Sequence, residues 1–490
     1  MKKSLALILT IALIVSLALF LKAEPSYVSG SDSKNSSFVD FLAEIFGNVD
    51  TLSSNQCRYD AKDNQGVGLD TIKIIANPQG GYLGVCHFPI GGSSSEYFQA
   101  RLVCSADLLN WTFVRTVELQ ASQPTIAQAP NGVYIVAFEK HVFIGAKEER
   151  HVGFHYYPNL TCLLTGSEFY EKIVNLTEGV QLEGTPNINN MTIGNSIMNA
   201  SVGFHYNDAY GLDNVATGHL TVPLDNPKDT TRWNWTTMPL PEYNEKLRKD
   251  WNVKGHIGDR DYGQIFGRNF TLQEGNLYEP SPQTNWTAWR IFLYDHLTSN
   301  FTMLNIKTHK GSTSFGNPKF TFLKSPNGKD CIVVTYFLFS EGAESGEAGE
   351  LIFYREFETK QFSLVYKGKS YFANVTSNST ISNFNFNETE RSISFNVSGP
   401  DGSKGYCIVK IPNNLTQELW QGNYTIFLDG APLQFENWND VEDTYIYFTY
   451  QHPTHQVTII IPEFPSVAIL SLFMAISTFT VASKRKRALK

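Results

Sequence analysis

Three carboxylates and two amides stand at equivalent places in five copies of one sequence pattern: Asp70, Glu183, Asp259, Gln123 and Asn317. A typical copy is Gly184-Thr185-Pro186-Asn187-Ile188, a short polar turn before an apolar residue, and the copies recur about every 60 residues. If the copies meet at a common axis, the carboxylates could serve as a general acid and as a base or nucleophile. The amides could then hydrogen-bond a ligand.

The segments that must position these side chains are short strands. Runs of five to eight residues rich in Val, Ile, Tyr and Phe alternate with Gly, Pro, Asn and Asp turns, as at 81–88, 133–138, 201–206 and 332–339. Units of three or four strands at this period predict a five-bladed β-propeller over residues 68–372. We interpret 268–285, which is rich in Gly and Asn, as an insertion loop in the fourth and longest unit.

The remaining segments divide around this propeller. Residues 24–67 are predicted to be a linker with a possible short helix at 38–46, and 373–458 contain six short strands typical of a small antiparallel β-sandwich. The fold class is therefore all-β, a propeller followed by a sandwich, with hydrophobic helical segments at both termini. We expect the sandwich to act as a spacer.

Two motifs carry a resemblance to five-bladed glycosidases of the arabinanase, β-xylosidase and invertase type. Ser105-Ala106-Asp107-Leu108-Leu109-Asn110-Trp111 resembles a turn between their outer strands, and Glu183-Gly184-Thr185-Pro186 resembles their general-acid segment. The resemblance implies that Glu183 is the acid and that Asp70 is the base or nucleophile. The chain departs from this family at Gln123, where the family has an aspartate.

The fourth copy adds charged candidates beside the axis. Asp259 could restore the charge that is missing at Gln123, and Arg260 could either contact substrate or pair with its acidic neighbours. We therefore name Glu183, Asp70 and Asp259 as candidate catalytic residues. The candidate substrate-binding residues are Gln123, Arg260, His256 and Asn317.

Metal, cofactor and nucleic-acid sites find little support in the sequence. His155 and His205 lie in identical pentapeptides but at different offsets from the preceding proline, which favours core strands over metal ligands. No cofactor motif stands in a suitable context. The net charge of −8 argues against a nucleic-acid partner.

Both ends and the sequons point to the cell surface. Residues 1–23 fit a secretory signal peptide or signal anchor, and residues 459–490 contain Pro462-Glu463-Phe464-Pro465, an uncharged run and a basic tail. The uncharged run can just span a bilayer, which makes the membrane a partner. The whole tail resembles the sorting signals of archaeal surface proteins, which implies a sorting transpeptidase as a further partner; a plain membrane anchor is the alternative. Sixteen Asn-x-Ser/Thr sequons predict an extracellular glycoprotein.

Cysteine usage leaves two alternatives open. The six cysteines are widely spaced and suit an oxidising compartment, and Cys86 and Cys104 fall on strands expected to be neighbours. They are the best candidate disulfide, with buried free thiols as the alternative.

The leading hypothesis is a glycoprotein that is anchored to the cell membrane, with most of the chain outside the cell. Its propeller would bind a carbohydrate in an axial funnel, and hydrolysis of that ligand is a further hypothesis. The alternative is a non-catalytic adhesion or surface-layer protein on the same scaffold.

Overall fold

The computed structural model of the chain describes residues 37–89, 98–145, 147–278 and 286–461. The signal segment predicted at 1–23 and the sorting motif, apolar run and basic tail at 462–490 lie outside the described residues. Among the described residues, no helix combines the length and the apolar character that a bilayer span requires.

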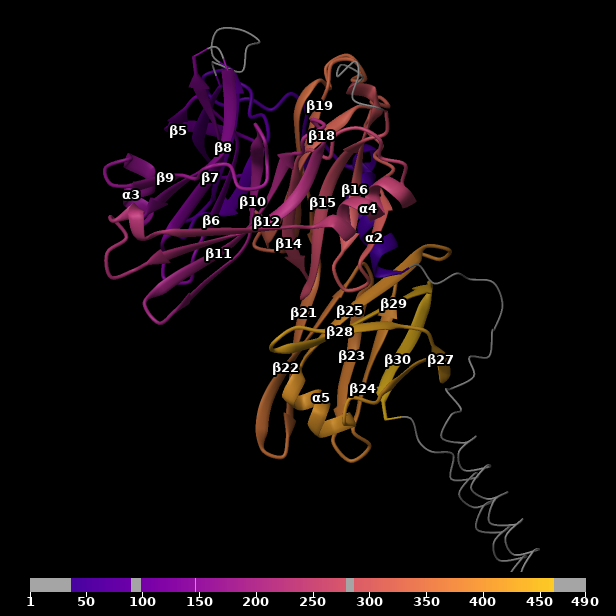
Figure 1. The fold of residues 1–490 in the computed structure, drawn as a ribbon. Coiled ribbons are helices and arrows are strands. Elements are labelled where there is room, and N and C mark those ends of the chain that lie inside the picture. Colours follow the sequence, from indigo (N-terminus) through magenta and orange to yellow (C-terminus); the bar gives the residue numbers. More distant parts are fainter. Residues whose placement is uncertain (1–36, 90–97, 146, 279–285, 462–490) are drawn as a thin grey trace, which may run out of the picture. The chain divides into compact units, whose positions relative to one another are not determined.

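Five four-stranded antiparallel sheets, here called blades and numbered in chain order, make up the first part of the fold (Figure 1). Blade 1 consists of β2 (Lys73–Ala76), β3 (Tyr82–Pro89), β4 (Phe98–Ser105) and β5 (Trp111–Leu119). Blade 2 consists of β6 (Ala121–Gln128), β7 (Tyr134–Ile144), β8 (Lys147–Tyr157) and β9 (Tyr170–Ile173). Blade 3 consists of β10 (Glu183–Gly194), β11 (Ile197–Asn207), β12 (Asp213–Pro223) and β13 (Asn234–Pro239). Blade 4 consists of β14 (Arg260–Ile265), β15 (Arg268–Asn276), β16 (Trp289–Asp295) and β17 (Asn300–Met303).

Blade 5 is completed by a strand from the start of the described chain. It consists of β18 (Phe315–Lys324), β19 (Asp330–Leu338), β20 (Gly349–Phe357) and β1 (Cys57–Arg58). β1 is the outer strand, with Cys57 opposite Phe353 and Arg58 opposite Ile352. The linker predicted at 24–67 was therefore wrong at these residues, because a strand of two residues leaves no alternating pattern to detect.

The first strands of the blades lie side by side in a ring, with β2 beside β6, β6 beside β10, β10 beside β14, β14 beside β18 and β18 beside β2. This is the arrangement of a β-propeller. In blades 2, 3 and 5 the recurring proline lies in a β-bulge, since the register shifts between Ser122 and Thr125, Gly184 and Asn187, and Gly316 and Lys319. Proline cannot donate to a ladder, so a bulge is one of the few places in a sheet that accepts it.

Two expectations about blades 1 and 4 were wrong. The residues 268–276, interpreted as part of a loop, form β15, the second strand of blade 4. Cys86 and Cys104 lie on adjacent strands, but Cys104 is opposite Leu83, three residues from Cys86. An odd offset places the two thiols on opposite faces of the sheet, and both are free.

Few helices accompany the blades. α3 (Leu160–Thr165) and α4 (Pro241–Asp250) connect strands, and the short turns η1 (Val49–Thr51), η3 (Thr230–Arg232) and η4 (Trp286–Ala288) are 3-10 helices. The helix predicted at 38–46 is present as α2 (Phe38–Gly47), which begins with a capping box between Ser37 and Asp40. Its buried face, with Phe38 and Phe46, joins a core that includes blades 4 and 5.

Two five-stranded sheets form the second part of the fold, coloured orange to yellow in Figure 1. One has the order β21 (Thr359–Tyr366), β22 (Lys369–Ser377), β25 (Lys404–Pro412), β29 (Asp443–Gln451) and β28 (Glu436–Asn439). The other has the order β23 (Thr380–Asn387), β24 (Ser392–Ser398), β30 (Thr454–Ile460), β26 (Thr425–Leu428) and β27 (Ala431–Leu433), and α5 (Asn413–Trp420) follows β25.

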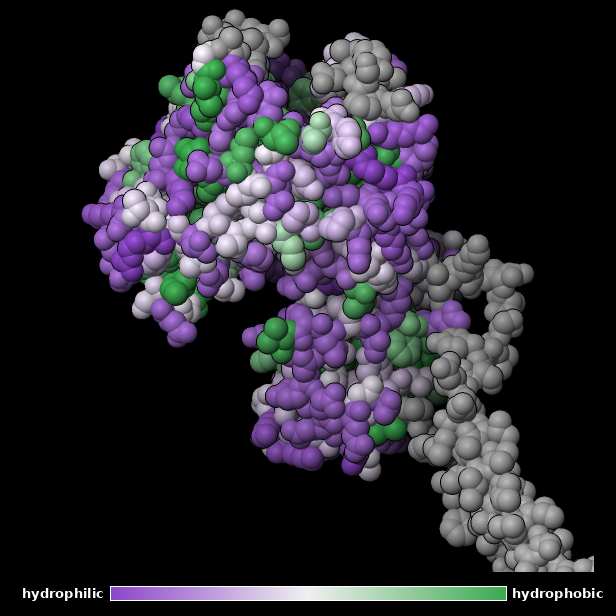
Figure 2. Space-filling model, in the orientation of Figure 1, coloured by the Kyte–Doolittle hydropathy of each residue, from purple (hydrophilic) through white to green (hydrophobic). Residues whose placement is uncertain are grey.

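Both sheets share one apolar core, as in a β-sandwich. The boundary predicted at 373 was wrong, because β21 pairs with β22 and β22 pairs with β25, so the sandwich begins at Thr359. On the face seen in Figure 2, hydrophilic residues cover most of the surface and hydrophobic residues form small separate groups.

Candidate functional site

A cavity of about 710 Å³ lies at the axis of the propeller and is lined by residues from all five blades. We call it the axial pocket. Its aromatic lining residues are Phe98, Trp286, Trp289 and Phe339. Trp286 stacks on Phe339, with ring centroids 4.7 Å apart and an angle of 27° between the rings. The remaining lining is mostly polar, so the pocket offers flat apolar faces beside hydrogen-bonding groups.

Blade 2 supplies a dense polar cluster because of its strand register. His141 of β7 is opposite Arg150 of β8, and Ser122 of β6 is opposite Glu139 of β7. Side chains two residues apart on a strand share a face, so Glu139 lies beside His141 and Glu148 beside Arg150. The five side chains therefore project from one face into the axial pocket.

Hydrogen bonds link this cluster. Ser122 Oγ lies 2.8 Å from His141 Nε2, and His141 Nδ1 lies 2.7 Å from Glu148 Oε1. Arg150 donates from Nε to Glu148 at 3.1 Å and from Nη1 to Glu139 at 3.1 Å. One guanidinium thus holds two carboxylates in fixed positions.

Two buried glutamates of the pocket have opposite proton affinities. Burial opposes the ionisation of Glu139, but the charge of Arg150, together with the N–H that Thr185 donates, outweighs it and holds the pKa of that carboxyl below its ordinary value. Burial, reinforced by the charge of Asp259, raises the pKa of Glu274 to about 8. At neutral pH Glu139 is ionised and Glu274 is mostly protonated.

The turns at the start of four blades explain why these groups are buried at the axis. Their left-handed residues are Thr71 (φ 58°), Gln123 (φ 50°), Thr185 (φ 41°) and Asn317 (φ 49°). In each case the backbone N–H donates to a side chain of the preceding blade. The pairs are Thr71 with Glu350 at 3.1 Å, Gln123 with His87 at 3.1 Å, Thr185 with Glu139 at 3.2 Å and Asn317 with Glu274 at 2.6 Å. These contacts support an unfavourable backbone conformation and fix the acceptors at the axis.

The histidines of the pocket differ in charge. Burial lowers the pKa of His87 to about 3, so this ring is neutral. A hydrogen bond to Asp213 at 2.7 Å raises the pKa of His256. Burial lowers the pKa of His205, whose Nδ1 lies 2.5 Å from Thr185 Oγ1.

Three of the residues predicted from the sequence, Gln123, His256 and Asn317, line the axial pocket. The other four, Glu183, Asp70, Asp259 and Arg260, are not among its lining residues. The carboxylate of Glu183 is buried and accepts backbone N–H groups of Thr177 at 2.6 Å, Glu178 at 2.5 Å and Gly179 at 2.9 Å. It stabilises the loop before β10, and its role as the catalytic acid stays a prediction.

Asp259 and Asp70 also lie outside the set of residues that line the axial pocket. Asp259 Oδ1 accepts a hydrogen bond from Lys319 Nζ at 2.6 Å, and both residues are buried. Burial, together with the charge of Asp60, raises the pKa of Asp70 to about 7. Asp259 is thus half of a buried ion pair, whereas the charge of Asp70, added to the effect of burial, raises the pKa of Glu350. The catalytic roles of both residues stay predictions.

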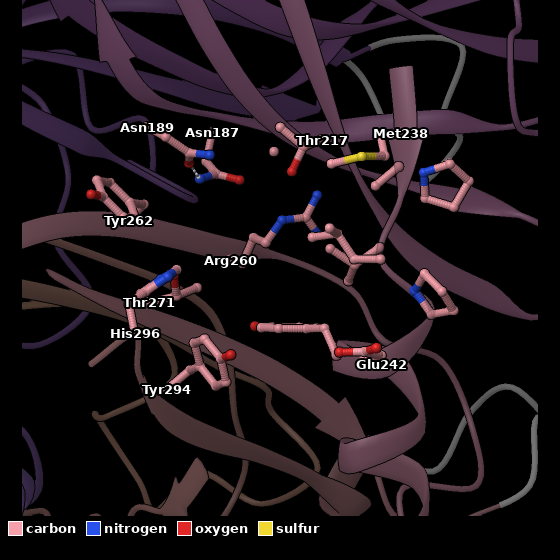
Figure 3. Close-up of a pocket in the computed structure, with 17 residues that line it drawn as sticks. Asn187, Asn189, Thr217, Met238, Glu242, Arg260, Tyr262, Thr271, Tyr294 and His296 are labelled. Atoms are coloured by element: carbon pink, nitrogen blue, oxygen red, sulfur yellow. Dashed lines mark hydrogen bonds between the residues drawn. The ribbon is translucent and has the colours of Figure 1, made fainter. Parts of the chain in front are cut away.

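Arg260 points into a second cavity, of about 610 Å³, between blades 3 and 4. Figure 3 shows its side chain among Asn187, Thr217 and Tyr294. Burial lowers its pKa to about 10, so the guanidinium remains charged at neutral pH. None of its three nitrogens has a hydrogen-bond partner among the described residues.

One group of potential metal ligands lies elsewhere on the propeller. Single ligand atoms of Glu118, His155 and Glu171 lie within 4.8 Å of one another. Lys140 also donates to Glu118, and the pentapeptide of His155 belongs to β8, a core strand.

The sequence did not reveal Glu139, Glu148 or Glu274. These residues stand on second and third strands, opposite or diagonal to the blade starts. The available signal was the turn between β6 and β7, because following that hairpin forward from Ser122 leads to Glu139, the residue opposite it.

No protein-family model matches the chain, and no curated protein does. Solved structures with a similar course include a thermostable family-43 glycoside hydrolase, with a TM-score of 0.40 and 9% identity over 64% of this chain and 95% of that one. Sucrose-6-phosphate hydrolase from Lactobacillus gasseri has a TM-score of 0.38 and 9% identity over 84% of this chain and 94% of that one. Alpha-L-arabinofuranosidase from Lactobacillus brevis has a TM-score of 0.37 and 10% identity over 61% of this chain and 94% of that one. Likeness at these TM-scores carries no argument about activity.

Proposed function

We propose that this chain is a five-bladed propeller protein that binds a carbohydrate in the axial pocket. The observation that carries the proposal is the composition of the pocket wall. The stacked pair Trp286 and Phe339 and the neighbouring Trp289 offer flat apolar faces, which suit the C–H faces of a sugar ring. Carboxylates and imidazoles around them can bond its hydroxyl groups.

Binding can be measured by calorimetry with oligosaccharides of arabinan, xylan and fructan and the full chain. Trp286→Ala and Trp289→Ala should each weaken binding at least about tenfold, which is about 1.4 kcal/mol. Phe372→Ala, at an exposed aromatic side chain of the sandwich, is the matched control and should bind as the wild type does. No binding to any carbohydrate, or equal loss in all three variants, would contradict the proposal.

Hydrolysis of a glycosidic bond is a second candidate function, favoured by the opposite pKa shifts of Glu139 and Glu274. A protonated Glu274 could donate a proton to the leaving oxygen, while the ionised Glu139 activates water. Glu274→Gln and Glu139→Gln should then abolish release of reducing sugar, and Glu183→Gln should not. Binding without hydrolysis in the wild type would instead favour the non-catalytic adhesion or surface-layer role.

Anchoring at the cell surface remains a proposal based on both ends of the chain. The sequon asparagines support the glycoprotein part of it, because none of those within the described residues is buried. Digestion of intact cells with an external protease, followed by detection of the membrane-bound remnant, tests the location. Protection of the whole chain from protease would contradict it.

A further inference from the structure

A hydrogen-bonded chain of three side chains lies in the wall of the axial pocket. Ser122 Oγ is 2.8 Å from Nε2 of His141, and Nδ1 of His141 is 2.7 Å from Oε1 of Glu148. Hydroxyl, imidazole and carboxylate in this order are the parts of a hydrolytic triad. We propose that Ser122, His141 and Glu148 hydrolyse an O-acyl ester of the carbohydrate bound in this pocket. The substrate class rests on the proposed function.

The contacts of His141 determine the role of each nitrogen. A carboxylate can only accept, so Nδ1 carries the proton and donates it to Glu148. Nε2 then carries the lone pair and accepts the hydroxyl proton of Ser122. Arg150 fixes Glu148 from its other side through the 3.1 Å bond of Nε. The imidazole is thereby held in the tautomer that a general base requires.

A competing acceptor lies near the serine. Glu139 Oε1 is 3.3 Å from Ser122 Oγ, which is longer than the contact with His141. Glu139 is already paired with Arg150 at 3.1 Å and with the N–H of Thr185 at 3.2 Å. In the proposed triad the hydroxyl donates over the shorter contact, to His141, and Arg150 offsets the negative charge of both carboxylates.

The reaction needs no reactant besides the ester and water. Ser122 Oγ forms a bond to the acyl carbon as its proton moves to His141 Nε2, and the bond from that carbon to the sugar oxygen breaks. His141 then gives the proton to the sugar oxygen. Water attacks the acyl-serine with His141 as base, which releases the carboxylic acid and restores Ser122.

The oxyanion formed at each attack needs a hydrogen-bond donor in the pocket. Nε2 of His205 and Nε1 of Trp289 are buried, line the pocket and have no hydrogen-bond partner among the described residues. With Nδ1 of His205 accepting from the hydroxyl of Thr185 at 2.5 Å, Nε2 carries the proton and can donate. A short acyl group such as acetyl leaves room for the sugar in about 710 Å³.

The test uses the full chain with p-nitrophenyl acetate and acetylated xylan. Acetate release should occur, and Ser122→Ala and His141→Ala should each lower kcat at least about hundredfold. Glu148→Gln should lower kcat and change the pH profile, as expected for a positioning residue. Ser363→Ala, at an exposed serine of β21, is the control and should keep the wild-type rate.

A second measurement does not depend on the folding of any variant. A fluorophosphonate probe should label the wild-type chain, and peptide mass spectrometry should place the label on Ser122. The inference is overturned if the probe leaves Ser122 unlabelled, or if folded Ser122→Ala releases acetate at the wild-type rate. Calorimetry with the wild-type chain separates the two proposals, because binding of the unacylated oligosaccharides without acetate release overturns this inference and leaves the proposed function standing.

Discussion

Lys319 of β18 in blade 5 reaches to Asp259 at the start of the neighbouring blade 4, and its Nζ lies 2.6 Å from the carboxylate oxygen Oδ1. Both side chains are buried, and Lys319 also donates to the backbone oxygen of Arg260 at 3.2 Å. The pair connects the start of blade 4 to blade 5. An aspartate held in this way is a structural group.

Removing one partner of this ion pair should be costly. Lys319→Met leaves the Asp259 charge buried without its cation and should lower the free energy of unfolding by about 3 to 5 kcal/mol. Asp259→Asn should cost a similar amount. The double variant, measured by urea unfolding, should lose less than the sum of the two. Additive losses would show that the two side chains do not interact.

Arg260 should behave in the opposite way. Its buried guanidinium has no hydrogen-bond partner among the described residues, so Arg260→Met should leave the free energy of unfolding unchanged or raise it. Arg268 is the matched control, because it is equally buried but bonds Asp295 at 3.0 and 2.6 Å. Arg268→Met should destabilise by about 3 kcal/mol. Equal losses in the two variants would mean that Arg260 is paired in solution.

Glu183 should matter for stability and not for ligand binding. Glu183→Ala leaves the N–H groups of Thr177, Glu178 and Gly179 without their acceptor and should cost about 1 to 3 kcal/mol. Saccharide affinity at 25 °C should stay at the wild-type value. Glu242→Ala, at an exposed carboxylate, is the control and should change neither quantity. Loss of saccharide binding in a folded Glu183→Ala variant would show that Glu183 belongs to the ligand-binding site.

The fold was more predictable from the sequence than the site was. The proline turns were visible because each bulge needs the same small set of residue types, and they led to Gln123 and Asn317, which do line the axial pocket. What a turn does not reveal is the register of the next strand. Glu139 and Glu274 lie on the second strands of their blades. The segment that contains Glu274 is rich in Gly and Asn, so it was interpreted as a loop.

The sequence also did not predict the direction of individual side chains. Glu183 stands at a blade start, as predicted, but its carboxylate turns back to the loop before β10. Cys86 and Cys104 stand on neighbouring strands, as predicted, but on opposite faces. In both cases the element was right, and the orientation was decided by hydrogen bonds that residue types do not reveal: those to the preceding loop for Glu183, and those that set the register of β3 and β4 for the cysteines.

Glu274 should give stability a pH dependence of known sign. Its pKa rises from an ordinary value of 4.5 to about 8, so the folded chain keeps a proton that the unfolded chain loses between these values. The free energy of unfolding should therefore fall as the pH rises through this window, by up to about 1.4 kcal/mol per pH unit from this group. Asp70 acts in the same direction, so the measurement is the difference between wild type and Glu274→Gln. Parallel pH profiles of the two proteins would contradict the assignment.

Gly184 should be required because Glu139 lies against it. A Cβ at Gly184 would be 1.8 Å from Oε2 of Glu139, whereas a Cβ at Gly194, in the same strand β10, would meet nothing within 4 Å. Alanine changes strand propensity in the same direction at both positions, so the difference between the variants isolates the contact. Gly184→Ala should lower the free energy of unfolding by about 1 to 3 kcal/mol, and Gly194→Ala should stay within about 0.5 kcal/mol of wild type. Because displaced Glu139 also loses the N–H of Thr185 and its pairing with Arg150, saccharide affinity of Gly184→Ala should fall at least about tenfold. If both variants unfold and bind as the wild type does, the packing of Glu139 against β10 is wrong, and with it the wall of the axial pocket.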